Sequence, residues 1–174
     1  MKIAVIGAGA IGNLVAGYLK TKGEDVTLLG HRDSVNAIEA GALRISGARG
    51  DFNIKIDACD KLNYNPELVI LATKTQDIDG ALKENLSFLA GATILTTQNG
   101  IRADDIVAQY IPKKNIISSI VMFGATYLEP AKVVHNFEGD WIIGRIFERN
   151  DAATINIKET LSQIFSVTIS ENIR

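Results

Sequence analysis

Runs rich in apolar residues alternate along the chain with segments whose apolar residues recur every three or four positions. Runs typical of buried parallel strands cover Lys2–Ile6, Asp25–Leu29, Leu68–Ala72, Thr93–Thr97, Asn115–Phe123 and Val167–Ile169. Segments with the spacing of an amphipathic helix cover Ile11–Lys22, Ile78–Leu89, Ala103–Tyr110 and Ile157–Phe165. Strands that alternate with helices in this way predict one α/β domain with a mainly parallel sheet.

Two pairs of short segments predict β-hairpins outside this alternation. In the first pair, Leu43–Ser46 and Phe52–Ile56 flank a turn that contains two glycines, and the second segment alternates with period two. In the second pair, Val133–His135 and Trp141–Gly144 flank the turn Glu138-Gly139-Asp140. We therefore expect the later part of the chain to add a C-terminal hairpin extension to the sheet.

Composition and charge exclude several classes of function. The 174 residues suffice for about one domain, and 47% hydrophobic with 22% charged residues is ordinary for a globular protein. The net charge is −2, which favours neither nucleic acid nor a membrane surface as a partner. Cys59 is the only cysteine, so we expect no disulfide framework and a reducing, cytoplasmic location. His31 and His135 lack metal-ligand spacing, and we expect no metal site.

A glycine motif lies at the start of the chain, between the first predicted strand and the first predicted helix. It reads Gly7-Ala8-Gly9-Ala10-Ile11-Gly12 and matches the GxGxxG pattern of dinucleotide sites in the expected strand–turn–helix context. Gly7 allows the tight turn, Gly9 lets the backbone approach a pyrophosphate, and Gly12 lets the helix pack close to the strand. The alternative is a glycine turn needed only for packing. The motif and the element order predict a Rossmann-like, doubly wound domain over residues 1–169, with helices on both faces of the sheet.

The residues after the second strand bear on the choice between NAD and NADP. An NAD site usually has a carboxylate there, whereas this chain has Gly30-His31-Arg32, followed at once by Asp33. Because a guanidinium can bind a 2′-phosphate through a planar pair of hydrogen bonds, Arg32 predicts a preference for NADP. The alternatives are a solvated surface arginine for Arg32 and a spectator or adenine-stacking role for His31.

Two polar clusters follow later strands, at the edge of the sheet where open α/β proteins bind ligands. The first is Ala72–Asp77 and contains Lys74, whose charge suits a phosphate or a substrate. The second is Thr97–Ile101 and contains Asn99, whose carboxamide can donate and accept together. The alternatives are a solvated loop lysine and an ordinary Asn-Gly turn.

Taken together, the GAGAIG, ATKTQD and QNGI segments resemble those of the ketopantoate reductase (2-dehydropantoate 2-reductase) family. The similarity covers the whole chain and extends, more loosely, to Phe123–Thr126 and Val133–His135. Members of that family reduce 2-dehydropantoate to pantoate with NADPH, a step in pantothenate and coenzyme A biosynthesis.

The resemblance also implies roles for individual residues. Gly7–Gly12 would bind the pyrophosphate and Arg32 the 2′-phosphate, while Lys74 would lie beside the cofactor. Asn99 would lie between the nicotinamide and the substrate, and Ala125 would contact the cofactor through its backbone. His135 is interpreted as structural, because a hairpin far from the ligand edge is a poor place for a catalytic group.

The last residues resemble the family only up to the start of its second domain. Ser170 is a plausible helix N-cap, and residues 170–174 are expected to begin a helix. In the family a helical domain starts here and supplies a general-acid lysine and a substrate-binding glutamate, and no residue of this chain matches that lysine. We therefore expect dinucleotide binding without appreciable turnover, whether the sequence is an engineered truncation or a natural short form. An uncovered apolar face would also favour self-association.

Two rival functions stay open at the level of sequence. One is a reductase of a different 2-oxo acid, since the family's second domain carries much of the choice of substrate. The other is a dinucleotide-sensing module without chemistry, which would need the glycine motif but not Lys74 and Asn99.

Overall fold

The computed structural model describes residues 1–100 and 102–173. Ile101, from the second polar cluster, and Arg174, from the predicted last helix, lie outside the described residues. The helices are α1 (Ala10–Thr21), α2 (Arg32–Ala40), α3 (Ile78–Asn85), α4 (Arg102–Val107) and α5 (Ala152–Leu161), with 3-10 turns η1 (Thr75–Asp77), η2 (Leu86–Phe88) and η3 (Lys113–Asn115). The strands are β1 (Lys2–Ile6), β2 (Asp25–Leu29), β3 (Leu43–Gly47), β4 (Phe52–Ile54), β5 (Asp57–Cys59), β6 (Leu68–Leu71), β7 (Thr93–Thr96), β8 (Ile116–Val121), β9 (Gly124–Glu129), β10 (Lys132–Phe137), β11 (Asp140–Arg145) and β12 (Ser166–Ile169).

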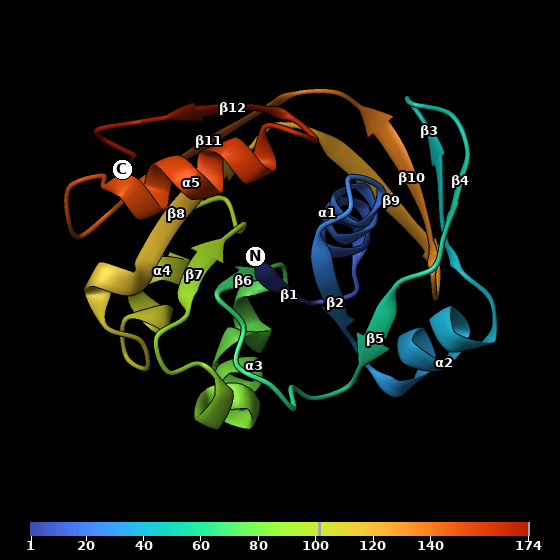
Figure 1. Ribbon diagram of the computed structural model, residues 1–174, viewed down its shortest axis with the longest axis horizontal. Coiled ribbons are helices and arrows are strands. Elements are labelled where there is room, and N and C mark those ends of the chain that lie inside the picture. Colours follow the sequence, from blue (N-terminus) through green and yellow to red (C-terminus); the bar gives the residue numbers. More distant parts are fainter. Residues whose placement is uncertain (101, 174) are drawn as a thin grey trace.

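The described residues form one large sheet with the strand order β12-β11-β8-β7-β6-β1-β2-β5 (Figure 1). From β5 to β8 all neighbours run parallel, and only the pairing of β11 with β8 is antiparallel. The order β5-β2-β1-β6-β7-β8 is the doubly wound Rossmann order, in which the chain reverses direction across the sheet between β1 and β6. The predicted fold class is therefore confirmed.

The carboxyl ends of the central strands meet at one edge of the large sheet, which we call the carboxyl edge. Ile6 at the end of β1 pairs with Leu29 of β2 and Leu71 of β6, and Leu71 pairs with Thr96 of β7. The first polar cluster and the glycine motif, which follow β6 and β1, therefore lie side by side at this edge. In doubly wound sheets, ligands bind at this edge, where the strand order reverses.

A second sheet, with the order β4-β3-β10-β9, covers helix α1 on the side away from the large sheet (Figure 1). Because α1 lies between two sheets, eight consecutive residues, Gly12–Leu19, are buried. A Cβ atom on Gly17 would lie 2.5 Å from Cδ1 of Ile45 on β3, so the missing side chain lets this sheet approach the helix. Helices α3 and α4 pack with a separate apolar cluster on the other face of the large sheet.

The second predicted hairpin is wrong in its pairing. Strands β10 and β11 follow one another but lie in different sheets, β10 between β3 and β9, and β11 between β8 and β12. The hairpin of this region is formed by β9 and β10, around the turn at Ala131, which has a φ of 62°. Two short apolar segments on either side of a Glu-Gly-Asp turn identify two strands but not their partners. The buried stretch from Ile143 to Arg145 shows instead that β11 lies inside a sheet.

Three further elements were not predicted. Helix α2 offers only Val35 and Ile38 as buried apolar residues, too few for a clear helical period. Strand β5 has three residues, and β9 is exposed over most of its length, so neither has an apolar run.

The first hairpin is confirmed, with β3 antiparallel to β4.

Residues 170–173 are not helical. The Asn172 N–H donates to Ser170 Oγ over 3.2 Å, which is the kind of bond that an N-cap serine accepts. Among the described residues, no helix has the length and apolar character needed to cross a membrane.

Candidate functional site

The glycine motif forms the tight connection between β1 and α1 at the carboxyl edge. Gly7 has a φ of +116°, which strongly favours glycine, and its N–H donates to the Leu29 carbonyl over 2.9 Å. A Cβ atom on Gly7 would lie 2.6 Å from the backbone of Ala72 and Thr73, and one on Gly12 would lie 1.8 Å from the Gly7 carbonyl oxygen. Two of the three glycines are thus required by the backbone itself.

Gly9 differs, because a Cβ atom there would have nothing within 4 Å. Gly9 is the N-cap of α1 and provides no side-chain cap, and the first helical bond runs from the Asn13 N–H to the Gly9 carbonyl. The buried Asn13 side chain also donates to the carbonyls of Ala8 and Gly9, over 2.7 Å each. The start of α1 therefore offers uncapped N–H groups and the positive end of the helix dipole to an open space, an arrangement suited to a pyrophosphate.

At the ends of β2 and β5, the Arg32 side chain forms an ion pair with Asp60. Nη2 of Arg32 lies 2.9 Å from Oδ2 of Asp60, and the two side chains are 71% and 49% exposed. The Gly30 N–H donates to the Cys59 carbonyl over 3.1 Å, which ties the two strand ends together. Burial raises the pKa of the Cys59 thiol, so this cysteine stays protonated rather than reactive. Asp60 was not singled out from the sequence, because it is adjacent to Arg32 only through the pairing of β2 with β5.

Lys74 lies after β6, with an exposed side chain, and is the N-cap of η1. The loop that carries it is held by Gln98, whose Nε2 donates to the carbonyls of Leu71 (3.0 Å) and Thr73 (2.7 Å). Among the described residues, the buried atoms Gln98 Oε1 and Thr73 Oγ1 have no hydrogen-bond partner. Such unpartnered polar atoms at the carboxyl edge are compatible with a polar ligand or with ordered water.

The Asn99 side chain binds the backbone of Val121 at the end of β8. Its Nδ2 donates to the Val121 carbonyl over 3.3 Å, and its Oδ1 accepts from the Val121 N–H over 3.1 Å. The carboxamide thus continues the hydrogen bonding between β7 and β8 beyond Thr96. Although Asn99 is exposed at the expected edge, its side chain also has a structural partner.

A buried carboxylate lies between α4 and strands β7 and β8. Asp104 on α4 accepts hydrogen bonds from the Thr96 hydroxyl (2.7 Å) and the Ser118 hydroxyl (2.8 Å), which connects α4 to β7 and β8. The Ser119 hydroxyl donates to the Thr96 carbonyl over 2.6 Å. The sequence gave no reason to select Asp104, since an acidic residue in a short helix usually faces solvent.

Ala125 and His135, also considered from the sequence, lie next to one another in the second sheet. Ala125 on β9 is half-buried and pairs with His135 on β10. His135 is fully buried, with Nδ1 2.9 Å from the Tyr18 hydroxyl and Nε2 3.0 Å from the Phe137 carbonyl oxygen. Both ring nitrogens are therefore engaged, in agreement with the structural interpretation of His135. The burial also lowers the pKa of its imidazole.

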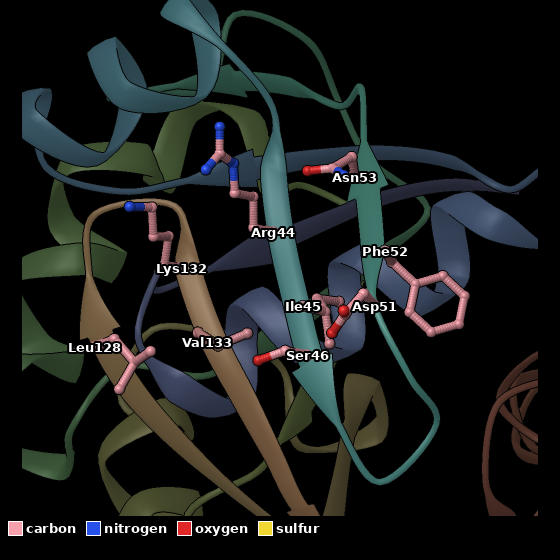
Figure 2. Close-up of a pocket in the computed structure, with 9 residues that line it drawn as sticks. All are labelled: Arg44, Ile45, Ser46, Asp51, Phe52, Asn53, Leu128, Lys132 and Val133. Atoms are coloured by element: carbon pink, nitrogen blue, oxygen red, sulfur yellow. The ribbon is translucent and has the colours of Figure 1, made fainter.

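Two surface hollows lie away from the glycine motif. The first, of about 460 Å³, lies on the outer face of the second sheet, where Figure 2 shows Arg44 and Lys132 side by side on β3 and β10. The second, of about 420 Å³, lies between η1 and α4 and includes Gln76 and Arg102. In the part of the chain that the structure describes, no group of three or more His, Cys, Asp or Glu side chains could hold a metal ion.

A family model described as ketopantoate reductase PanE/ApbA matches residues 3–147. The chain belongs to this family. Among curated members, the 2-dehydropantoate 2-reductase of Pyrococcus abyssi is 37% identical over 145 residues, which are 83% of this chain and 47% of that protein. The 2-dehydropantoate 2-reductase of Pyrococcus horikoshii is 33% identical, and the alignment covers 99% of this chain and 57% of that protein. The chain thus spans about half the length of these relatives.

Two solved structures superpose closely on this chain, and one of them is named a 2-dehydropantoate 2-reductase. The 2-dehydropantoate 2-reductase of Geobacter metallireducens superposes with a TM-score of 0.91 and 26% identity, over 98% of this chain and 58% of that one. A D-mandelate dehydrogenase with NADH and anilino(oxo)acetate superposes with a TM-score of 0.90 and 26% identity, over 99% and 58%. The resemblance stated from the sequence is confirmed at the level of the family.

Proposed function

We propose that this chain is the dinucleotide-binding half of a 2-dehydropantoate 2-reductase of pantothenate biosynthesis, with NADP(H) as its cofactor. The observation that carries the proposal is the open space at Gly9. It lies at the start of a helix with uncapped N–H groups, at the point of the carboxyl edge where the strand order reverses. Relatives named 2-dehydropantoate 2-reductase support the reaction class.

Each predicted site residue then has a part in holding the cofactor. The backbone of Gly7–Gly12 binds the pyrophosphate, and Arg32, after β2, binds the 2′-phosphate. Lys74 contributes positive charge from the loop after β6, and Asn99 lies at the nicotinamide and substrate end. Ala125 contacts the cofactor through its backbone. The bound cofactor supplies the hydride that converts the ketone of a 2-oxo acid into a hydroxyl group.

Ketone reduction also requires a proton donor within hydrogen-bond reach of the developing alkoxide. Lys74, in the loop after β6, is a cationic candidate, but its side chain is exposed. We infer that the general acid comes from a helical second domain that begins near Ser170. The chain by itself then binds cofactor without appreciable turnover, and the lone Cys59 suits a cytoplasmic location.

A second candidate is reduction of a different 2-oxo acid. The D-mandelate dehydrogenase, whose structure contains NADH and anilino(oxo)acetate, matches this chain as well as the 2-dehydropantoate 2-reductase does. That neighbour also makes NADH a cofactor to be tested beside NADPH.

Calorimetric titration of the chain with NADPH and with NADH tests the proposal. We expect NADPH to bind more tightly, and Arg32→Ala to lower NADPH affinity at least tenfold, or about 1.4 kcal/mol. Arg149→Ala, which removes an exposed arginine beyond the end of β11 that pairs with the start of β8, is the matched control and should change neither affinity. Binding of neither dinucleotide by the chain would reduce the conclusion to family membership and fold.

A further inference from the structure

The ion pair between Arg32 and Asp60 places a carboxylate where the proposed function requires a 2′-phosphate. The two side chains are 2.9 Å apart, and neither is deeply buried, so both are accessible to a ligand at the carboxyl edge. In Rossmann domains that bind NAD, a carboxylate at this end of the sheet accepts a hydrogen bond from the ribose 2′-hydroxyl. That carboxylate usually ends the second strand, whereas here it follows β5.

The position of Asp60 is fixed by the sheet. Asp60 directly follows β5, whose last residue, Cys59, pairs with Leu29 of β2. The Gly30 N–H then donates to the Cys59 carbonyl over 3.1 Å. A Cβ atom on Gly30 would lie 2.5 Å from the Ala8 side chain, so the end of β2 touches the glycine motif. The ion pair therefore lies beside the proposed cofactor site.

A carboxylate in this position affects the two cofactors in opposite directions. It can accept a hydrogen bond from the 2′-hydroxyl of NADH, but it repels the 2′-phosphate of NADPH. It also occupies the Arg32 guanidinium, which would otherwise be free to bind that phosphate through two parallel hydrogen bonds. Because exposed ion pairs are weak, a phosphate can displace Asp60 from Arg32, but the carboxylate then stays close to the phosphate charge.

We propose that Asp60 is a specificity-determining residue that restrains the preference of this chain for NADPH and supports binding of NADH. The inference rests on the proposed function, since it requires a dinucleotide at the carboxyl edge. Arg32 and Asp60 act in opposition, and the ratio of the two affinities depends on both.

Calorimetric titrations of Asp60→Asn with NADPH and NADH test this role. The substitution keeps the shape of the side chain and removes its charge. NADPH should bind more tightly and NADH more weakly, so that the ratio of the two affinities moves at least tenfold toward NADPH. Asp57→Asn is the matched control, because Asp57 begins the same strand, is 80% exposed and lies away from Arg32. It should leave the ratio unchanged.

The Arg32→Ala background separates this role from a merely structural one. If Asp60 repels the 2′-phosphate directly, Asp60→Asn must still raise NADPH affinity when Arg32 is absent. An unchanged ratio in the single variant, or a fall in its NADPH affinity, would mean that Asp60 only orients Arg32 and would overturn the inference. Binding of neither dinucleotide by the unmodified chain would instead overturn the proposed function, and the inference with it.

Discussion

Gly9 and Gly17 show how differently the start and the middle of α1 are used. At Gly9, where α1 begins at the carboxyl edge, an added Cβ would meet nothing within 4 Å. At Gly17, two turns further along, it would lie 2.5 Å from Ile45 and 3.1 Å from both Leu43 and Ile54. The first glycine leaves a space open, whereas the second lets a sheet close over the helix.

The polar groups near the two glycines differ in the same way. The start of α1 has uncapped N–H groups, and the side chain of the nearby Arg32 is 71% exposed. Around the middle of the helix, the hydroxyl of the buried Tyr18 and the imidazole of the buried His135 bind each other. The Arg49 side chain packs over this region, with its guanidinium carbon 4.6 Å from the centre of the Tyr18 ring. The same guanidinium donates two hydrogen bonds to the Glu138 carboxylate, over 2.5 and 2.7 Å. Exposed polar groups near the start of α1 are accessible to a ligand, while the buried pair of Tyr18 and His135 stabilises the fold.

The largest expected effect is the difference in stability between the Gly12→Ala and Gly9→Ala variants. In Gly12→Ala the new methyl group would lie 1.8 Å from the Gly7 carbonyl oxygen, so backbone must move. We expect a loss of roughly 3 kcal/mol, at the upper end of the usual cost of overpacking. For a chain of this size that loss lowers Tm by roughly 6–12 °C in a thermal unfolding experiment.

Gly9→Ala is the matched control for that experiment. Its methyl group enters open space, so stability should fall by less than about 1 kcal/mol, the cost of an alanine N-cap. Dinucleotide affinity should nevertheless decrease. An equal loss of Tm in both variants would contradict the conclusion that Gly9 faces open space while Gly12 packs against backbone.

The next largest effect concerns the middle of α1, which the second sheet covers. Tyr18→Phe removes the hydroxyl that lies 2.9 Å from His135 Nδ1 and leaves that buried nitrogen without a partner. Urea denaturation should show a loss of about 1–3 kcal/mol, with dinucleotide affinity unchanged. Tyr127→Phe, on the exposed strand β9, is the control and should cost less than about 0.5 kcal/mol. A change in dinucleotide affinity for Tyr18→Phe, but not for Tyr127→Phe, would contradict the separation between the start and the middle of α1.

The smallest effect is a pH dependence of stability. The Phe137 carbonyl can only accept, so His135 Nε2 carries the proton and Nδ1 accepts from Tyr18. Burial lowers the pKa of His135 below its ordinary value of 6.5, so the unfolded chain binds a proton first as the pH falls. Its contribution to stability is therefore complete above about pH 6.5 and is lost as the pH falls through the lower, folded value. Denaturation curves between pH 7 and 5 should show this decline, and His135→Gln should reduce it.

The sequence predicted the large sheet better than the second one. Central strands such as Leu68–Leu71 are buried on both faces, and a continuous apolar run is a clear signal for such a strand. Strands β9 and β10 are only partly covered, so their sequences do not reveal that they pair with each other and with β3. The choice of partner depends on contacts between residues far apart in the chain.

The candidate site was predictable only where it depends on backbone geometry. The positions of Gly7 and Gly12 are dictated by contacts within a short motif, and the sequence identified both. Asp60 and Asp104 were missed because their partners, Arg32 in one case and Thr96 and Ser118 in the other, come from other strands. Asn99 was located at the correct edge, but its bonds to Val121 could not be foreseen.

The central claim is that a dinucleotide binds across the open start of α1. Amide NMR spectra of the ¹⁵N-labelled chain, recorded during titration with NADPH, test it most directly. We predict the largest shifts at Gly7–Gly12 and Arg32, with further shifts at Lys74 and Asn99. Shifts centred instead on Arg44 and Lys132, in the hollow of Figure 2, with the glycine motif unmoved, would contradict the account.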